Sequence, residues 1–323
     1  MANSAKKKTA RESFEGLQVW KVVGIFGLVF LAVQLAVAFF SISTNALMRW
    51  LGAGENARVF IGNTLSRAGM VTAVLLICAP VIRKVFRQDA RALLFPFTPE
   101  WFKDLAFGFL LSAAVMALAF GALLAADQIT LEGLALGPRP LDAWLRTIWL
   151  ALLVNAAAAA VEEVLFRGVL LTGLKESWDK SGAVFISVVI FAASRVLAAG
   201  VRQPNWLEFI PLLALPGAML AWAFLRTGNL WLASGIHFGW TFFQHDVFNL
   251  AARLGGDTLF GWQTVQNSPA WLLGNHYGME TSLAGVISVL SVSAGIWFYT
   301  RNRLPHAEKS SSLLDDHAPD HSL

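Results

Sequence analysis

Charged residues are scarce in this chain. Only 14% of its 323 residues are Asp, Glu, Lys or Arg, whereas 56% are hydrophobic, and the mean hydropathy is +0.57. An ordinary soluble domain has about 25% charged and 45–50% apolar residues. A soluble fold of this composition would lack the polar side chains needed to cover its surface. The composition therefore excludes a disordered chain and favours a membrane protein.

Cysteine is nearly absent as well. Cys78 is the single one, so an internal disulfide is impossible and a disulfide-stapled secreted domain is excluded. The sequence also lacks a GxxxxGK[ST] nucleotide-binding loop and an HExxH zinc motif. The net charge of +4 is concentrated in a few loops. That distribution indicates membrane orientation rather than nucleic-acid binding.

Eight apolar stretches are candidates for membrane-spanning helices, each of which needs about 20 mostly apolar residues. They are Val22–Phe40, Val59–Ile82, Leu105–Ala126, Trp144–Leu171, Ser181–Val201, Phe209–Leu225, Asn229–Leu250 and Thr281–Thr300. We therefore predict an all-α, polytopic membrane protein with about eight transmembrane helices. The sixth helix is expected to be broken by Pro211 and Pro216.

The same pattern divides the chain into six segments. They are a basic N-terminus, the first transmembrane helices, a core with most of the intramembrane charges, a loop, a last helix and a polar tail. In chain order these are residues 1–18, 19–126, 144–250, 251–280, 281–300 and 301–323. We expect the loop to rest on the membrane interface through Phe260, Trp262 and Trp271. The tail is expected to be disordered.

Lys and Arg gather at three places that lie on one side of the membrane if there are eight spans. These are the N-terminus, the loop after the second helix and the C-terminal tail, with Lys6, Lys7, Lys8, Arg11, Arg83, Lys84, Arg87, Arg91, Arg301, Arg303 and Lys309. Cytoplasmic loops carry an excess of these residues. We therefore predict that both termini are cytoplasmic and that residues 251–280 face outward.

Two adjacent glutamates and an arginine stand in the fourth helix, where charged groups are costly and by default mark a functional site. At 100° per residue, Glu163 and Arg167 lie about 40° apart on the helix surface, whereas Glu162 and Arg167 lie about 140° apart. We therefore predict a Glu163–Arg167 ion pair, with Glu162 left for general acid or base chemistry. The alternative is an ion network that only holds helices together.

Two further helices carry polar groups. His237, Thr241 and His245 recur at i, i+4 and i+8 and form one polar stripe. This stripe could face a water-filled cavity, or His237 could be a satisfied structural residue. Arg195, in the fifth helix, must find a carboxylate or a carbonyl, or reach the outer interface with its long side chain.

These residues resemble the motifs of the CPBP family of CAAX proteases and bacteriocin-processing (Abi-type) enzymes. The family motif EExxxR is matched by Glu162, Glu163 and Arg167, and NLWxxxxxHxxW is matched over residues 229–240, including His237. The resemblance covers about residues 144–244. It implies an intramembrane glutamic endopeptidase without a metal or cofactor. Glu162 would be the general base toward a water, Glu163 and Arg167 would position it, and His237 would stabilise the oxyanion or transfer a proton.

The sequence departs from the family pattern at two positions. The second motif, FxxxH, begins at Phe191, but its histidine is replaced by Arg195. Arginine is not a base at any reachable pH, although it can supply positive charge or bind a substrate carboxylate. The last polar position of the third motif, Asn or Asp in the family, is Thr241, which offers one hydroxyl donor. His245, one turn further on, is a candidate substitute for the missing histidine.

The intramembrane charges also predict where the site lies. Glu162, Arg195 and His237 are each costly in lipid, and a shared hydrated cavity lowers all three costs together. We therefore expect them to converge from three helices on one cavity that opens toward the cytoplasmic half of the bilayer.

Three functions remain open at this stage. The first is an endopeptidase of a bacterial plasma membrane that cuts a peptide or protein, with or without a lipid anchor. The second is a catalytically impaired relative that acts as a membrane binding or immunity protein, which Arg195 and Thr241 favour. The third is a transporter, which the intramembrane charges and the proline-containing helix would suit, although we find no inverted repeat.

Overall fold

The computed structural model describes residues 19–134, 140–199, 206–250, 258–266, 268–274 and 278–303. The basic segment 1–18, residues 251–257 of the expected interfacial loop and residues 304–323 of the tail lie outside these ranges. The predictions made for those three segments therefore stay predictions.

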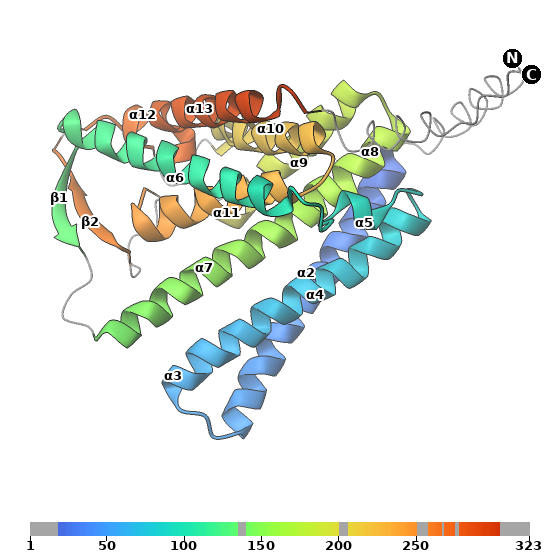
Figure 1. Cartoon of the computed structure of the whole chain (residues 1–323), viewed down its shortest axis with the longest axis horizontal. Helices are drawn as coiled ribbons and strands as arrows, with labels where there is room; N and C mark the ends of the chain where they lie inside the picture. Colours follow the sequence, from blue (N-terminus) through green and yellow to red (C-terminus); the bar gives the residue numbers. More distant parts are fainter. Residues whose placement is uncertain are drawn as a thin grey trace, which may run out of the picture.

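Helices dominate the described part of the chain (Figure 1). The α-helices are α2 Val19–Trp50, α3 Glu55–Ala57, α4 Asn63–Lys84, α5 Ala90–Leu93, α6 Trp101–Ala125, α7 Leu141–Glu163, α8 Thr172–Ser177, α9 Lys180–Ala199, α10 Ile210–Thr227, α11 Trp231–Phe242, α12 Ala270–Leu273 and α13 Leu283–Thr300. Three segments are π-helical: η1 Arg58–Gly62, η2 Val164–Leu171 and η4 Phe243–Val247. Two are 3₁₀-helical: η3 Trp206–Phe209 and η5 Met279–Thr281.

Seven helical segments within the described ranges are long and apolar enough to cross a membrane. The predicted all-α, polytopic membrane fold is therefore confirmed. The predicted span Asn229–Leu250 is the exception, because α11 has only 12 residues and η4 adds 5. Instead of facing lipid, α11 is buried among α6, α7 and α10. It forms the centre of the bundle.

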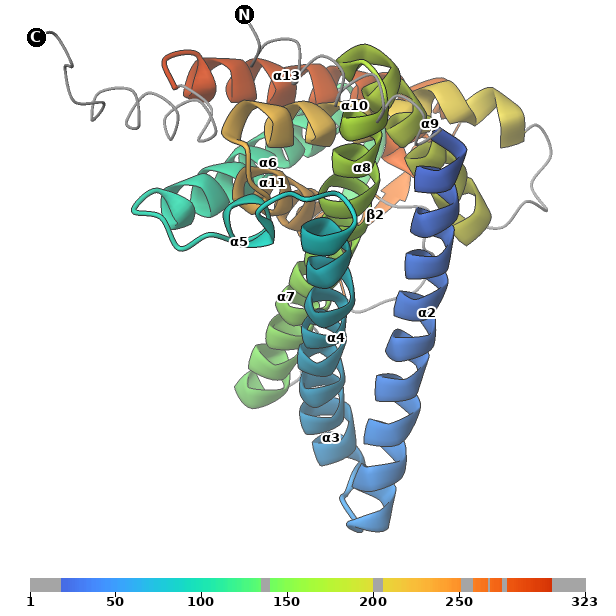
Figure 2. The ribbon, with the colours of Figure 1, turned by 90° about the vertical axis from the view of Figure 1, so that its right-hand side faces the viewer.

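Two helices are longer than the sequence predicts. The segment α7–η2–α8 is one continuous helix of 37 residues, Leu141–Ser177. Helix α2 has 32 residues and packs along α4, and Figure 2 shows this pair extending beyond the group formed by α6, α10, α11 and α13. The predicted break in the sixth helix is wrong, because α10 runs without interruption through Pro216. Pro211 lies in the first turn of α10, where backbone N–H groups have no partner within the helix, so its missing N–H costs no hydrogen bond.

Glycines let α6 and α11 approach each other closely. A Cβ atom added to Gly108 of α6 would lie 2.7 Å from the Ile236 nitrogen, and one added to Gly239 of α11 would lie 2.7 Å from the Phe109 oxygen. A Cβ at Gly235 would collide with the Leu105 carbonyl in the same way. Small residues at such contacts let helix backbones meet in a membrane. This contact fixes the position of α11, which carries His237.

A two-stranded antiparallel sheet, which the hydropathy pattern does not predict, covers one end of the bundle. Strand β1 (Ile129–Leu134) pairs with β2 (Phe260–Thr264), with Ile129 opposite Thr264 and Leu134 opposite Phe260. Its register shifts between Leu131 and Gly133. The sheet lies at the end of the bundle opposite to the one that carries α5 (Figure 1).

Candidate functional site

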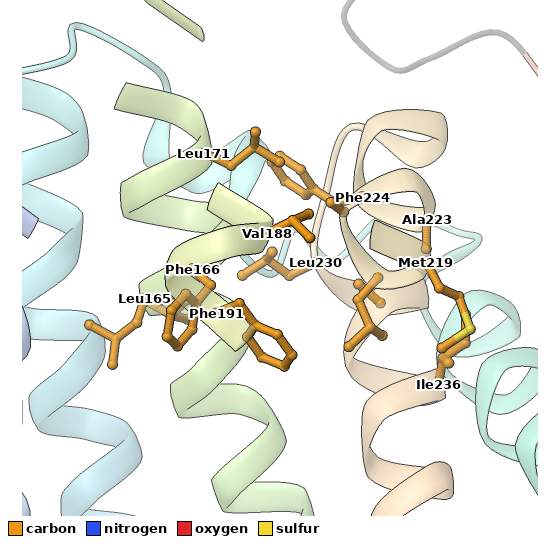
Figure 3. Close-up of a cluster of buried hydrophobic side chains, with 14 of the residues drawn as sticks. Leu165, Phe166, Leu171, Val188, Phe191, Met219, Ala223, Phe224, Leu230 and Ile236 are labelled. Carbon is orange, nitrogen blue, oxygen red and sulfur yellow. The ribbon is translucent and has the colours of Figure 1, made fainter. Parts of the chain in front are cut away.

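Apolar side chains from four elements meet around the middle of the bundle. Figure 3 shows this cluster between η2, α9, α10 and α11. Its members include Leu165, Phe166, Val188, Phe191, Met219, Phe224 and Ile236. A charged group placed here is removed from water, so it needs a partner of opposite charge and further hydrogen bonds.

Glu163 and Arg167 form such a buried pair. The Arg167 Nη1 donates to Glu163 Oε1 at 2.9 Å, and the exposed fractions of the two side chains are 1% and 0%. Arg167 Nη2 donates to the Gly217 carbonyl of α10 at 3.0 Å, and its guanidinium lies 4.7 Å from the centre of the Phe191 ring. The predicted ion pair between these two residues is confirmed. It joins α7, η2, α9 and α10 at one point.

The segment that carries Arg167 is not an ordinary α-helix. Residues 164–171 form the π-helix η2, and all eight are buried. The Thr172 hydroxyl donates to the Arg167 carbonyl at 2.9 Å and so satisfies an oxygen within the irregular turn. Short π-helical segments occur frequently at functional sites because they re-aim side chains. The two glutamates stand directly before this segment.

His237 connects both glutamates. Its Nδ1 lies 2.8 Å from Glu163 Oε1, and its Nε2 lies 3.7 Å from Glu162 Oε2. Glu163 Oε1 also accepts from Arg167 Nη1, and an oxygen that accepts from both neighbours assigns the hydrogen of His237 to its Nδ1 atom. The Nε2 atom is then left to face Glu162.

Arg195 points into the site rather than toward lipid headgroups. Its Nη1 lies 3.4 and 3.5 Å from the two carboxylate oxygens of Glu162. About 30% of each side chain is exposed. Glu162 is therefore the accessible glutamate of the pair, and it is not left unpaired as the helical offset suggested.

The segment that contains this site matches a known family. Residues 144–243 match the family model described as type II CAAX prenyl endopeptidase Rce1-like. This segment belongs to the CAAX protease family. The match runs from the first turn of α7 to the start of η4 and includes every site residue that the sequence motifs predicted. No curated protein and no solved structure matched the chain.

A small cavity lies beside His237 in the CAAX protease segment. It is lined by Phe191, Arg195, Leu213, Pro216, Met219, Leu220, His237, Trp240, Thr241 and Glu280. The volume of this cavity is about 20 Å³. About 10–15 Å³ is enough for one water. Arg195 and His237 line this cavity and also contact Glu162, but Glu162 is not among its lining residues. The three side chains therefore meet as expected, whereas only two of them line the cavity.

Thr241 lines the cavity but does not offer its hydrogen to it. The hydroxyl donates within α11, toward the carbonyl oxygens of His237 at 3.0 Å and Phe238 at 3.2 Å. The expected stripe also ends here, since η4 begins at Phe243 and changes the helical spacing. As a result, Gln244 is fully buried, whereas His245 is half-buried. The expectation that Thr241 supplies a donor to the site is therefore wrong.

The cavity lies further from the predicted cytoplasmic side than expected. Arg195 stands in the last two turns of α9, Leu213 stands in the first two turns of α10, and Glu280 stands just before α13. These helix ends face outward if both termini are cytoplasmic. Glu162 also lies about four turns before the end of its helix, because that helix continues past Leu171 to Ser177. Cytoplasmic termini and a cavity in the cytoplasmic half therefore cannot both be right.

Sequence reasoning missed Glu280. It belongs to η5, and its Oε2 accepts a hydrogen bond from Gln244 Nε2 at 3.0 Å. Its neighbours in the sequence form no motif, and only the return of the chain to α13 brings it to the cavity. Across the described ranges, no group of three or more His, Cys, Asp or Glu side chains is arranged to hold a metal ion.

Proposed function

We propose that this protein is an intramembrane endopeptidase that hydrolyses a peptide bond with a water activated by Glu162. The observation that carries the proposal is the arrangement of three groups around one accessible carboxylate. Glu162 lies within 3.4 Å of Arg195 and 3.7 Å of His237, whose other nitrogen is held by the buried Glu163. The match of residues 144–243 to a protease family supports the same reading.

Glu162, Arg195 and His237 each have a distinct role in the proposed reaction. Glu162 Oε2 and His237 Nε2 are 3.7 Å apart, which is too far for a direct hydrogen bond. One water beside the two atoms can form a hydrogen bond with each of them. Glu162 accepts a proton from this water as its oxygen forms a bond to the carbonyl carbon. The Arg195 guanidinium donates to the oxyanion that develops, and His237 in its protonated form donates to it through Nε2–H. The carbon–nitrogen bond then breaks, and the proton on Glu162 passes to the leaving amine.

The substrate is a peptide or protein at the membrane. We propose that the protein works in a bacterial plasma membrane with both termini cytoplasmic, which the Lys and Arg distribution supports. A lipid anchor on the substrate is compatible with the family match but is not required by the residues around Glu162. Peptides with and without a prenyl group decide between the two substrate classes.

The test compares variants of the purified protein in proteoliposomes. A proteome-derived peptide library is added, and new peptide ends are counted by mass spectrometry. Glu162→Gln should lower cleavage by about 10²-fold or more, because it removes the general base. Glu176→Gln is the matched control, since Glu176 bonds only to Gln88 at an exposed site among the described residues. Equal product from wild type and Glu162→Gln would refute the glutamate mechanism.

The impaired binding protein is the second candidate. Two observations favour it: Arg195 occupies both oxygens of Glu162, and the Thr241 hydroxyl donates to its own helix. The double variant Arg195→His and Thr241→Asn restores the family pattern and tests this alternative. If the natural chain cleaves nothing and the double variant cleaves the library, Arg195 and Thr241 impair catalysis, as the second candidate requires.

A further inference from the structure

The cavity beside His237 is built to hold water. Its polar wall carries Arg195, His237, Trp240 and Glu280. Trp240 is buried, and its indole N–H has no hydrogen-bond partner among the described residues. Buried waters typically bond to two to four groups of this kind. A water here would accept from a donor such as Trp240 and donate to a carboxylate.

Glu280 is the carboxylate on that wall with spare capacity to accept. Glu163 is fully buried and is not among the cavity-lining residues, although its Oε2 has no hydrogen-bond partner among the described residues. Glu162 has both oxygens near Arg195 and is not among the cavity-lining residues. Glu280, in contrast, accepts one bond, from Gln244 Nε2, and among the described residues it forms no ion pair. A carboxylate has about four acceptor positions, so several remain for a water.

Glu280 is also held firmly in place. It is only 9% exposed, and Gln244, which donates to it, is fully buried. The turn that carries it is closed by a bond from the Ser282 nitrogen to the Met279 carbonyl at 2.9 Å. Ser282 in turn caps α13 by accepting from the Gly285 nitrogen. A fixed carboxylate costs no reorganisation during a reaction.

We propose that Glu280 is a second catalytic proton acceptor, which supplies the function that the family pattern assigns to the histidine replaced by Arg195. This inference rests on the proposed protease activity. The attacking water loses two protons in full hydrolysis, because the products are a carboxylate and an ammonium ion. Glu162 takes the first and returns it to the leaving nitrogen. Glu280 accepts a hydrogen bond from the second proton and removes that proton when the new carboxylic acid ionises. Glu280 then passes the proton to solvent, and the leaving amine takes its second added proton from solvent to become an ammonium ion.

The test uses Glu280→Gln and Glu280→Asp in the same proteoliposome assay. A glutamine keeps an oxygen that can accept from Gln244, so the fold is retained, but it cannot take a proton. We expect kcat to fall by about 10²-fold with KM and the thermal unfolding midpoint unchanged. Glu280→Asp, which keeps a carboxylate, should recover at least a tenth of the wild-type kcat. Glu176→Gln again serves as the control.

Each outcome decides the matter. Wild-type kcat in Glu280→Gln, alongside loss of activity in Glu162→Gln, overturns the role of Glu280 and leaves the protease proposal standing. No cleavage by the wild-type protein overturns both. If Glu280→Gln also loses thermal stability, the aspartate variant decides: recovered kcat supports the proposal, and an inactive variant with wild-type stability refutes it.

Discussion

Neighbouring glutamates in this protein have opposite surroundings. Glu163 is fully buried between a guanidinium and an imidazole, whereas 29% of the Glu162 side chain is exposed. One residue of offset along α7 turns a side chain by about 100°, which is enough to send one into the core and leave the next at its edge. Glu163 therefore orients His237, and Glu162 is the glutamate that a substrate can reach.

Removing the cation of the buried pair should be strongly destabilising. Arg167→Ala leaves Glu163 buried without its guanidinium, at a cost of about 3–5 kcal/mol in the free energy of unfolding. The same helix provides the control: Arg146 pairs with Asp142 at 2.6 Å, but 38% and 63% of these side chains are exposed. Arg146→Ala should therefore cost about 1 kcal/mol or less.

Thermal unfolding in detergent measures both variants. A clear loss of stability in Arg167→Ala with little change in Arg146→Ala is expected. Similar midpoints for the two variants would mean that the Glu163–Arg167 pair contributes no more than a surface pair.

Contacts of residues that belong to a motif or carry charge inside the membrane could be predicted, and the contact of a residue outside any motif could not. The Glu163–Arg167 pair follows from their spacing of four, and the approach of Arg195 and His237 follows from the cost of charge in lipid. Glu280 lies more than a hundred residues beyond Glu162 and enters the cavity only because η5 packs beside α10. The donor role expected of Thr241 failed for a local reason: in a helix, a threonine hydroxyl readily donates to the carbonyl four residues before it.

The position of α11 depends on close backbone contact with α6. Apolar periodicity predicted a helix at this place but not its burial, because a fully enclosed helix and a membrane span are equally apolar. The π-helices η2 and η4 could not be predicted either, since hydrophobic periodicity does not distinguish i+5 from i+4 hydrogen bonding over so few residues. The glycines at positions 108, 235 and 239 are the local sequence feature that permits this contact between α6 and α11.

Adding one methyl group to this contact should displace α11. The Cβ of Gly235→Ala would collide with the Leu105 carbonyl, which belongs to backbone and cannot rotate away. We expect a loss of about 3 kcal/mol or more in the free energy of unfolding. Gly121→Ala in α6 is the control, because nothing lies within 4 Å of the added atom, and alanine favours a helix over glycine by up to about 1 kcal/mol.

These two alanine variants are compared by thermal unfolding, and Gly235→Ala is also assayed for proteolysis. A midpoint for Gly235→Ala equal to that of Gly121→Ala would contradict the close packing of α6 and α11.

The orientation of the whole molecule decides which compartment supplies its substrate. We predict that Gln88, in the loop after α4, faces the cytoplasm and that Gln263, in β2, faces outward. Single cysteines at these positions, in a chain with the buried Cys78 replaced by serine, can be tested with a membrane-impermeant thiol reagent added to intact cells. The reagent should label position 263 and not position 88.

The result also fixes the side of the membrane toward which the cavity beside His237 lies. Arg195 stands near the end of α9, Leu213 near the start of α10 and Glu280 just before α13, so all three lie toward the outward ends of their helices, as β2 does, if both termini are cytoplasmic. Labelling of position 263 alone would therefore place the cavity in the outer half. Labelling of position 88 alone would reverse the orientation and place it in the cytoplasmic half. The distribution of Lys and Arg predicts the orientation of the chain, but it does not give the depth of a cavity in the membrane.

The pairing of β1 with β2 has a consequence for how the chain is made. About 130 residues separate the two strands, so at 5–20 residues per second β1 emerges from the ribosome roughly 6–26 s before its partner. During that interval the backbone groups of β1 that later pair with β2 remain open to other strands. Four membrane-inserted segments, α7–α8, α9, α10 and α11, must be placed in the meantime. The sheet is therefore among the last features to form, and it covers the end of the bundle only after the whole segment that matches the protease family has been synthesised.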